Sequence, residues 1–471
     1  MASNSLHFCD KTRFLILLVT TICLSLIMSN TLALNFTILC MAEDAVVVEN
    51  DTITEAKYVY SETEKSWLFS AIAIGSLFGT YVVIKFTPSF GLRNVFTLFG
   101  VLTATATVFT PLAASAGYGW LFSMRLMQGF SYAIAFPVMG IVTSHWSSLR
   151  QSGTFLTILN CFIQFGPLFT MPISGLFCSS SYGWTAVYYT HAIATYAAFV
   201  IFYFVYRDQP KDHCNVSSSE LSIIADGKSS NHGHKQPVPY RAIITSIPIW
   251  GVWMSYFGCM CGVNLFMQFG PTYLNKALHY NLENTGFAGA APYVISAILK
   301  ILAGPVSDYS TCVSQRVRVI IFTFISQGVP TCALLTLAFL PEGFTTAGFG
   351  CYMLAITAFG MTPLSSIKSG QLVASQHAHF VMAVSAFLNS LIVLLLPNMV
   401  TSVAPQNTSA QWSTIFLITG AILFATNAFF VCVARAKPAE WTKEAPKQIQ
   451  RVFSVKESDT NLSSRIDMVN V

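Results

Sequence analysis

Charged side chains are scarce in this sequence. Only 10% of its 471 residues are Asp, Glu, Lys or Arg, whereas 54% are hydrophobic. Soluble globular proteins carry roughly 25% charged residues. The low charge therefore excludes a soluble globular protein of this size, and it indicates that lipid covers much of the surface.

Signatures of metal binding and of catalysis are missing as well. The twelve cysteines form no CxxC pair, and no Cys/His set has the spacing of a zinc site. The apolar runs contain no HExxH motif and no Ser/His/Asp grouping at a helix end. We interpret His232 and His234 as solvated residues. We expect no enzyme, no cofactor and no metal site.

Long apolar runs dominate what is present, and each is near the 20 or so residues that a helix needs to cross a bilayer. The first is longer than the roughly 7 to 15 residues of a signal-peptide core, so we expect it to be retained. The sequence thus predicts an all-α membrane protein with about twelve transmembrane helices. The runs cover residues 14–40, 66–86, 94–115, 118–141, 151–177 and 184–206, then 244–270, 285–306, 317–340, 344–366, 378–400 and 412–434.

The segment between the sixth and seventh runs is polar and rich in Ser, His and Pro, which predicts a linker rather than a span. Within it, Ser217 and Glu220 have the spacing of a capping box before Leu221, which favours a short surface helix. We expect a six-helix bundle over 1–206, a cytosolic linker over 207–243, a second six-helix bundle over 244–434 and a cytosolic tail over 435–471.

Basic residues lie in short runs between apolar stretches, not on one face as nucleic-acid binding requires. They orient the chain instead. With both termini in the cytosol, most Lys and Arg residues of the loops face the cytosol, and only Lys57, Lys65 and Lys276 lie outside. The sequons at Asn50 and Asn407 then lie outside, and we predict that both are glycosylated. The cytosolic set is Lys85, Arg93, Arg150, Arg207, Lys211, Lys228, Lys235, Arg241, Arg316, Arg318, Lys368 and Arg435.

Two cysteines, Cys40 and Cys178, are both predicted near the non-cytosolic surface. An oxidising compartment on that side would permit a disulfide between them. The sequence leaves their pairing open.

Six spans on either side of a linker is the layout of two related bundles around a central cavity that opens to each side in turn. Transport is the default function of that layout. A passive channel is disfavoured, because no span carries a repeated polar filter. A non-transporting receptor or sensor on a transporter scaffold is the alternative.

Arg125 is the most informative charge within a span. It lies in LFSMRLMQGFSYAIAFPVMG, flanked by apolar residues. An Arg near a helix centre costs roughly 2.5 to 3.5 kcal/mol on insertion scales, so it should face the bundle interior or a wet cavity. Its guanidinium fork suits a carboxylate or a phosphate. The alternative is a structural Arg that pairs with backbone carbonyls.

The predicted eighth span ends in a second group of polar residues. Lys300 lies two turns before Asp308, and its long stem allows it either to reach the interface or to face the cavity. Gly304, Asp308 and Arg316 belong to a helix end followed by a basic loop, which predicts a gate that latches one face shut. The equivalent loop of the first half keeps Arg93 but has no Asp.

Several motifs occur in a characteristic order: RLMQGFSYAIAFP with His145 and Trp146, then VPYRAIITSIPIWG, FGPTYLNKAL, GAAPYV and GPVSD. Together they resemble the anion:cation symporters, family 17 of the solute carriers, within the major facilitator superfamily. The resemblance implies a major facilitator fold and secondary active transport of a small organic or inorganic anion. It also implies H+ or Na+ as coupling ion.

Three positions depart from that family's pattern. Ala33, Tyr132 and Cys259 stand where members of the family carry an Arg, a carboxylate and an Arg. Of the charged cavity residues, Arg125 alone remains, which argues against a dicarboxylate held at both ends. We predict a substrate site of Arg125, Tyr132, Asn35 and Lys300. We expect a monomer, in the plasma membrane or in an endolysosomal or vesicular membrane.

Overall fold

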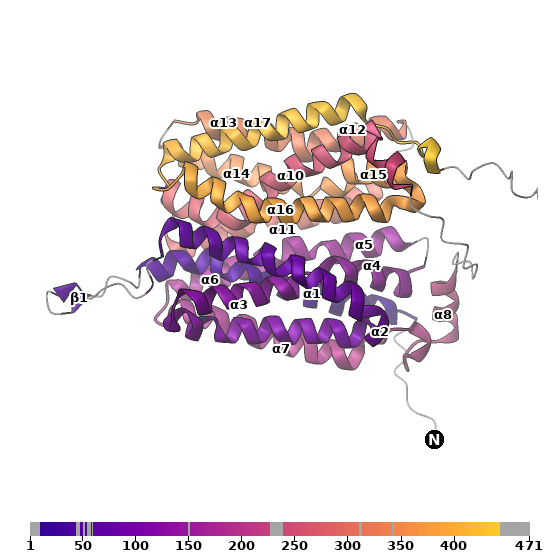
Figure 1. Ribbon diagram of the computed structural model, residues 1–471, viewed down its shortest axis with the longest axis horizontal. Coiled ribbons are helices and arrows are strands. Elements are labelled where there is room, and N and C mark those ends of the chain that lie inside the picture. The colour runs from indigo at the N-terminus through magenta and orange to yellow at the C-terminus, as the bar shows by residue number, and fades with distance from the viewer. Residues whose placement is uncertain are drawn as a thin grey trace, which may run out of the picture.

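Two groups of helices make up the described part of the chain. The computed structural model describes residues 10–43, 48–49, 52–53, 58, 60–148, 151–226, 239–309, 313–341 and 343–442. Figure 1 shows the helices that precede the linker, in indigo to magenta, side by side with those that follow it, in pink to yellow. Helix α8 lies at one end of the molecule and strand β1 at the other. We call these ends the linker end and the far end.

The N-terminal group packs mainly through α1, which contacts α6 and α7, and through α2, which contacts α3 and α7. Two crossings are built from helix pairs, α3 with α4 and α5 with α6. The elements are α1 (Thr12–Glu43), β1 (Val48–Glu49), β2 (Thr52–Ile53), α2 (Glu62–Ala116), α3 (Tyr118–Tyr132), α4 (Ala135–Trp146), α5 (Ser152–Asn160), α6 (Phe162–Cys178) and α7 (Gly183–Val205).

Helix α2 is two crossings joined by a kink. Its 55 residues would extend about 80 Å as one straight helix, more than twice the thickness of a bilayer core. The backbone leaves the helical region at Gly91, where φ is 77°, a conformation that glycine adopts without a steric penalty. The chain therefore turns back at Gly91, at the linker end.

The C-terminal group is arranged in the same way, with α10 against α16 and α17, and α13 against α14 and α17. One crossing is bent by 44° between α14 and α15. The elements are α9 (Tyr240–Ile244), α10 (Ile247–Thr272), η3 (Tyr273–Ala277), α11 (Leu282–Tyr309), α12 (Gln315–Thr323), η4 (Phe324–Gly328), α13 (Val329–Phe339), α14 (Thr345–Phe359), η5 (Thr362–Leu364), α15 (Ser366–Ala374), η6 (Ser375–His377), α16 (Ala378–Val403), α17 (Ser409–Val433) and η7 (Glu440–Thr442).

The number of crossings agrees with the apolar runs of the sequence. In the described part of the chain, ten helical segments are long and apolar enough to cross a membrane; α2 is long enough to cross twice, and the bent α14–α15 pair adds one more. Helices are the expected solution, because a lipid-exposed backbone must satisfy its own hydrogen bonds. The prediction of an all-α membrane protein with about twelve transmembrane helices is confirmed, with the two-residue strands β1 and β2 as a small addition. The domain limits at 206, 243 and 434 stay a prediction.

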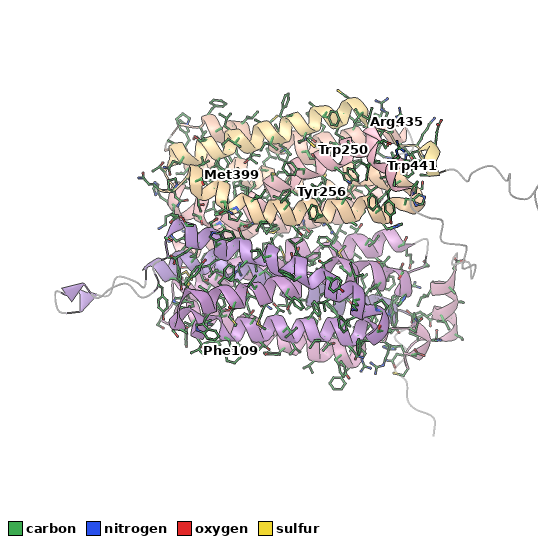
Figure 2. The ribbon with its side chains drawn as sticks, viewed as in Figure 1. Phe109, Trp250, Tyr256, Met399, Arg435 and Trp441 are labelled. Carbon is green, nitrogen blue, oxygen red and sulfur yellow. A yellow bond between two sulfur atoms is a disulfide. The ribbon has the colours of Figure 1, made fainter. Side chains whose placement is uncertain are left out.

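The outer surface has the pattern of a protein that lies in a bilayer. Apolar side chains such as Phe109 of α2 (Figure 2) and Phe424 of α17 are exposed on the outside of the helices. Exposed aromatic residues with a polar atom lie near the helix ends. Trp120 is in the first turn of α3, which begins at the far end, and Trp250 is in the first turn of α10 at the linker end (Figure 2). Such aromatic belts mark the two membrane interfaces.

The linker begins with η2 (Pro210–Asp212) and α8 (Ser218–Ala225), which confirms the short helix predicted there. Ser217 caps α8 by accepting the Glu220 N–H at 3.0 Å. The Glu220 carboxylate does not return to the cap, however, but accepts the main-chain N–H of Arg13 at 2.9 Å. Because acceptors stabilise a helix N-terminus, α8 fastens the start of α1.

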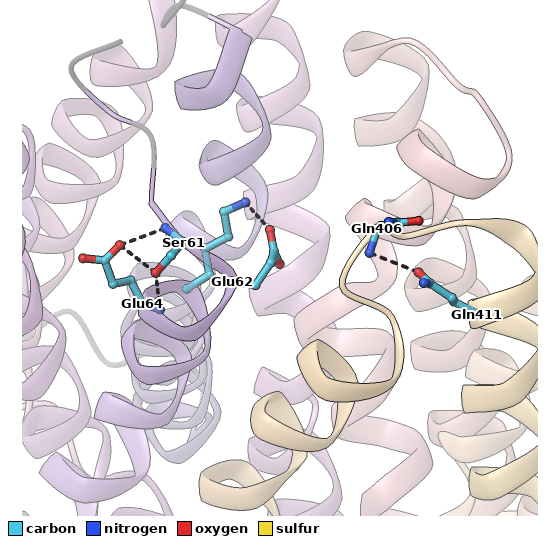
Figure 3. A network of polar contacts seen from close by, with 6 residues as sticks. Ser61, Glu62, Glu64, Gln406 and Gln411 are labelled. Carbon is cyan, nitrogen blue, oxygen red and sulfur yellow. Dashed lines mark hydrogen bonds and ion pairs between the residues drawn. The ribbon is translucent and has the colours of Figure 1, made fainter. Parts of the chain in front are cut away.

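The far end is closed by local caps and by a covalent link. Ser61 and Glu64 form a capping box at the start of α2, and Gln411 accepts the N–H of Gln406 at 3.0 Å before α17 (Figure 3). A disulfide joins Cys40, near the end of α1, to Cys178, the last residue of α6. The structure thus pairs the two cysteines whose pairing the sequence left open.

Candidate functional site

A cavity of about 1030 Å³ lies between the two bundles. Helices α1, α2, α3, α4, α5 and α6 line it on one side, and α10, α11, α14, α15 and α16 on the other. Its volume is near the upper end of the roughly 300 to 1,000 Å³ usual for small-molecule sites. Both bundles therefore contribute to one site, as expected for a site between repeats.

The cavity reaches the linker end. Among its lining residues, Gly153 and Thr154 in the first turn of α5 are exposed, as is Gln371 of α15. The first turn of α5 follows the end of α4 in the chain. The end of α4 lies beside the start of the linker, because Trp146 donates to the main-chain oxygen of Arg207 at 3.1 Å. A solute has a route into the cavity from this side.

Contacts between the bundles close the cavity at the far end. Ser66 donates to Asn398 Oδ1 at 2.9 Å. The rings of Phe69 and Phe269 meet edge to face with their centroids 5.3 Å apart. Helices α2 and α16 thus seal one side of this end.

On the other side of the far end, α6 and α11 touch through their backbones. A Cβ built on Gly175 would lie 3.0 Å from the Gly286 Cα and 3.0 Å from the main-chain oxygen of Leu282. Only glycine allows this approach.

Arg125 lies on α3, is 1% exposed and lines the cavity. Its Nε donates to the main-chain oxygen of Leu68 at 3.2 Å, and its Nη1 to that of Thr31 at 2.8 Å. Nη1 also donates to Gln128 Oε1 at 2.9 Å. Among the described residues, Nη2 has only a long contact of 3.5 Å to Asn35 Oδ1. Main-chain oxygens thus hold the guanidinium, and Nη2 keeps capacity to bind a ligand.

Tyr132 lies two turns after Arg125 on the same helix and lines the cavity. Its ring packs against Phe162 of α6, with the centroids 6.5 Å apart. The structure therefore brings Arg125, Asn35 and Tyr132 to one wall, as the sequence predicts.

Lys300 comes from the opposite bundle and does not reach the interface. It is 3% exposed on α11 and lines the cavity. Its Nζ donates to the main-chain oxygen and Oδ1 of Asn160, at 3.0 and 2.5 Å, and to Gln164 Oε1 at 3.1 Å. Of the two roles that the sequence allowed, the structure favours the one that faces the cavity.

The wall of the cavity is positively charged. Arg125, Lys300 and Lys368 line it, whereas no Asp or Glu does so in the described part of the chain. Buried charges are costly unless a group of opposite sign accompanies them. In a site of low dielectric, a lining that carries cations and, in its described part, no carboxylate favours the entry of an anion.

The predicted gate residues belong to elements that end or begin at the linker end. Gly304 and Asp308 belong to the last turns of α11, and their side chains lie outside the described residues. Arg316 is exposed in the first turn of α12. The structure thus leaves the latch as a prediction.

Arg93 binds within its own bundle. Its main-chain N–H donates to Asp208 Oδ1 at 3.0 Å, and its Nε to the main-chain oxygen of Tyr203 at 2.8 Å. The guanidinium also covers the Tyr203 ring at 4.2 Å. The first-half loop, which has no Asp of its own, thus receives a carboxylate from the segment after α7. Sequence reasoning missed Asp208, because it lies 115 residues away.

The two predicted glycosylation sites differ in whether the structure describes them. Asn50 lies outside the described residues. Asn407 lies at the far end between α16 and α17, with φ of 53°. Neither sequon is tested, so glycosylation stays a prediction.

Residues 14–397 match the model of the Major Facilitator Superfamily. The chain belongs to this superfamily. Solved structures support the same fold. A D-xylose–proton symporter bound to 6-bromo-6-deoxy-D-glucose aligns with a TM-score of 0.68 and 14% identity, covering 91% of this chain and 97% of that chain. An inward-facing, unoccupied bacterial homologue of the human lysosomal transporter Spinster aligns with a TM-score of 0.65 and 14% identity, covering 90% and 97%.

Curated relatives from this superfamily are transporters, not enzymes. Sialin from Homo sapiens is 25% identical over 415 residues, which cover 85% of this chain and 81% of sialin. Sodium-dependent phosphate transport protein 1 from Mus musculus is 23% identical over 454 residues, which cover 93% and 94%. A probable small intestine urate exporter from Mus musculus is 23% identical over 411 residues, which cover 84% and 82%. These relatives confirm the resemblance to the anion:cation symporters.

Proposed function

We propose that this protein is a secondary active transporter that moves a small organic or inorganic anion across a membrane by alternating access. The observation that carries the proposal is the cavity between the bundles, lined by three cations and, in the described residues, by no carboxylate. The cavity is reached from the linker end and closed at the far end, as one state of such a cycle requires. A charged cavity favours transport over a sensor without a substrate.

We propose that Arg125 anchors the anionic group of the substrate. Nη2 is its least occupied donor, and Asn35 lies beside it. Tyr132 contributes a hydroxyl rather than a charge. Lys300 supplies a second positive charge from the opposite bundle, so an anion in the cavity contacts both bundles.

The printed names of the relatives are consistent with this substrate class. One name refers to phosphate and to sodium, and another to urate. For this chain we propose a small anion as the substrate, with H+ or Na+ as coupling ion.

We propose that the linker end faces the cytosol, with both termini on that side and the protein acting as a monomer. The Cys40–Cys178 disulfide supports this orientation, because it lies at the far end and disulfides persist in oxidising compartments. The basic loops at the linker end support it too. The membrane is then the plasma membrane or an endolysosomal or vesicular one.

We propose that closure of the linker end uses Asp308, with Gly304 allowing close approach and with Arg316 and Arg93 as basic groups at the same end. Asp308→Asn would then keep insertion but shift the balance between states. Cysteines placed at each end would report the change. If each cysteine is as accessible in Asp308→Asn as in the wild-type background, this gate is excluded.

The test of the proposed function is uptake of radiolabelled phosphate and small carboxylates into vesicles, with imposed pH or sodium gradients. Arg125→Lys keeps the charge but loses the fork, so we expect uptake to fall at least about tenfold with surface expression retained. The matched control is Arg435→Ala, which removes an exposed Arg at the linker end (Figure 2). Wild-type uptake by an expressed Arg125→Ala protein would refute the anchor.

A further inference from the structure

A second hollow lies on the outside of the C-terminal bundle, where α11 ends and α12 begins. It has a volume of about 390 Å³, and its lining shares no residue with that of the cavity between the bundles. It opens to the outer surface, because Leu302 of α11 is 59% exposed and Ile321 of α12 is 44% exposed. We call it the outer groove.

The outer groove lies at the edge of the bilayer, at the linker end. The two apolar spans that border it end at Ala303 and begin at Gln315, and Figure 1 shows α12 at the linker end. The lining runs from Arg318 in α12 to Ile325 in η4, along about 10 Å of helix. Half of the hydrocarbon core of a bilayer is about 15 Å thick. The groove therefore extends inward from the interface within one leaflet.

One positive charge and apolar side chains make up the lining of the groove. Arg318 is half-buried, and the other lining residues in the described part of the chain are Leu, Ile, Val, Ala, Phe and Met. The five N–H donors of a guanidinium suit a phosphate, and they are enough to hold one beside a contact with the protein. An apolar hollow with a cation at its interfacial end matches a molecule that has an acyl chain and an anionic headgroup.

A lipid of the same leaflet is the molecule of this kind that meets the groove. An unfilled groove would lose van der Waals contacts along its apolar wall, and a soluble anion would leave that wall uncovered. Basic pockets between transmembrane helices on the cytoplasmic side of a membrane bind anionic headgroups. This is the side proposed above for the linker end.

The groove and the cavity share one wall. In α11, Lys300 lines the cavity, whereas the preceding residue, Leu299, lines the groove. At the 44° bend between α14 and α15, Gly360 lines the cavity and Met361 lines the groove. A molecule in the groove therefore packs against the segments whose other face shapes the cavity.

We infer that the outer groove binds an anionic phospholipid of the leaflet at the linker end. One acyl chain lies along Ile321 and Phe322, and the headgroup phosphate binds Arg318. The bound lipid supports α11 and the bend at Met361. This site is independent of which solute the cavity binds.

The test measures lipid binding to the purified protein by native mass spectrometry, with phosphatidylglycerol and phosphatidylcholine of the same acyl chains. We expect wild type to prefer phosphatidylglycerol by about fivefold, the contribution of one Arg near an anionic membrane surface. Arg318→Gln should bind the two lipids equally. The matched control is Arg241→Gln, which removes an exposed Arg of α9 outside the groove lining and should keep the preference.

Two further measurements separate the lipid from a free phosphate and from an effect on folding. Glycerol 3-phosphate has the phosphate but no acyl chains, so it should not compete with phosphatidylglycerol. Phosphatidylglycerol should raise the melting temperature of wild type more than that of Arg318→Gln, because a ligand that binds the folded state stabilises it.

Each contrary outcome overturns the site in a different way. Equal affinity of wild type for the two lipids would remove the role of the charge, and so would an Arg318→Gln protein that keeps the preference. Competition by glycerol 3-phosphate at the concentration of the lipid would indicate a soluble phosphate as the occupant. None of these outcomes bears on the uptake that tests the proposed function, because the readout is lipid binding.

Discussion

Lys300 of α11 and Asn160 of α5 connect the two bundles, since the Lys300 Nζ donates both to the main-chain oxygen and to Oδ1 of Asn160. A rocking motion of one bundle against the other would therefore stretch or break these hydrogen bonds. The pair also holds the charge of Lys300 without a carboxylate, so a bound anion competes with Asn160 for the same ammonium group.

This pair predicts energetic coupling. Asn160→Leu leaves the buried ammonium with fewer acceptors and should destabilise the protein by about 1.5 to 3 kcal/mol. Lys300→Met removes the charge itself. In a Lys300→Met background, Asn160→Leu should therefore lower the free energy of unfolding much less than it does in wild type. The difference between the two effects, the coupling energy, should be about 0.5 to 3 kcal/mol. The measurement is thermal unfolding of the four purified proteins, and additive effects would contradict a direct interaction.

The turn at Gly91 predicts a second effect on stability. A Cβ at this position would lie 2.5 Å from Asp208 Oδ2, and the φ of 77° disfavours any residue with a side chain. Gly91→Ala should lower the free energy of unfolding by about 1 to 3 kcal/mol.

The control for Gly91 is Gly140→Ala on α4, where an added Cβ meets nothing within 4 Å. It should melt at or above the wild-type temperature, because alanine favours helix over glycine. Equal melting temperatures for Gly91→Ala and wild type would show that the kink relaxes without cost.

His213 in the linker predicts a dependence of stability on pH. Burial lowers the pKa of His213, and Arg207 acts in the same direction, against the main-chain oxygen of Val205. Its Nδ1 accepts the N–H of Asn215 at 3.1 Å, which requires that nitrogen to be unprotonated. The unfolded chain binds the proton more readily. The contribution of neutral His213 to the free energy of unfolding is therefore complete above a pH of about 6.5. It is lost as the pH falls towards the lower pKa of His213 in the folded state.

The check is the melting temperature of wild type and His213→Gln between pH 8 and pH 5. The difference between the two should shrink or reverse on acidification. A difference that stays constant over this range would mean that His213 does not take up the proton on unfolding.

The orientation predicts two labelling results. A glycan on Asn50 should be lost in Asn50→Gln, whereas Asn215 should carry none. Cys214 is exposed at the linker end, so a membrane-impermeant thiol reagent should label it only after the membrane is opened. Labelling of Cys214 in intact cells, absent from Cys214→Ser, would invert the topology.

Hydrophobicity alone predicted most of the fold. The runs at 14–40 and 184–206 differ from Thr12–Met41 and Gly183–Val205 by two residues or fewer at the ends. The reason is physical: a bilayer imposes a length and a composition on each crossing that packing cannot override. The position of Arg125 in the cavity wall was predictable for the same reason, because an intramembrane charge is too costly to face lipid.

The remaining site residues depend on contacts between distant segments. Lys300 had two roles that local sequence cannot separate, and Asn160 decides between them across 140 residues. Asp208 reads as part of a polar linker until the fold places it beside Gly91.

In the proposed alternating-access cycle, the backbone contact of Gly175 with Gly286 would serve as a fulcrum at the far end of α6 and α11. The α5–α6 crossing has 27 residues, so at about 1.5 Å per residue it is a lever of roughly 40 Å, and a tilt of about 10° moves its other tip by roughly 7 Å. A small rotation at two glycines thus suffices to widen or narrow the entrance by the width of a solute. A bulkier residue at either glycine would move the fulcrum and change the stroke, without touching the cavity.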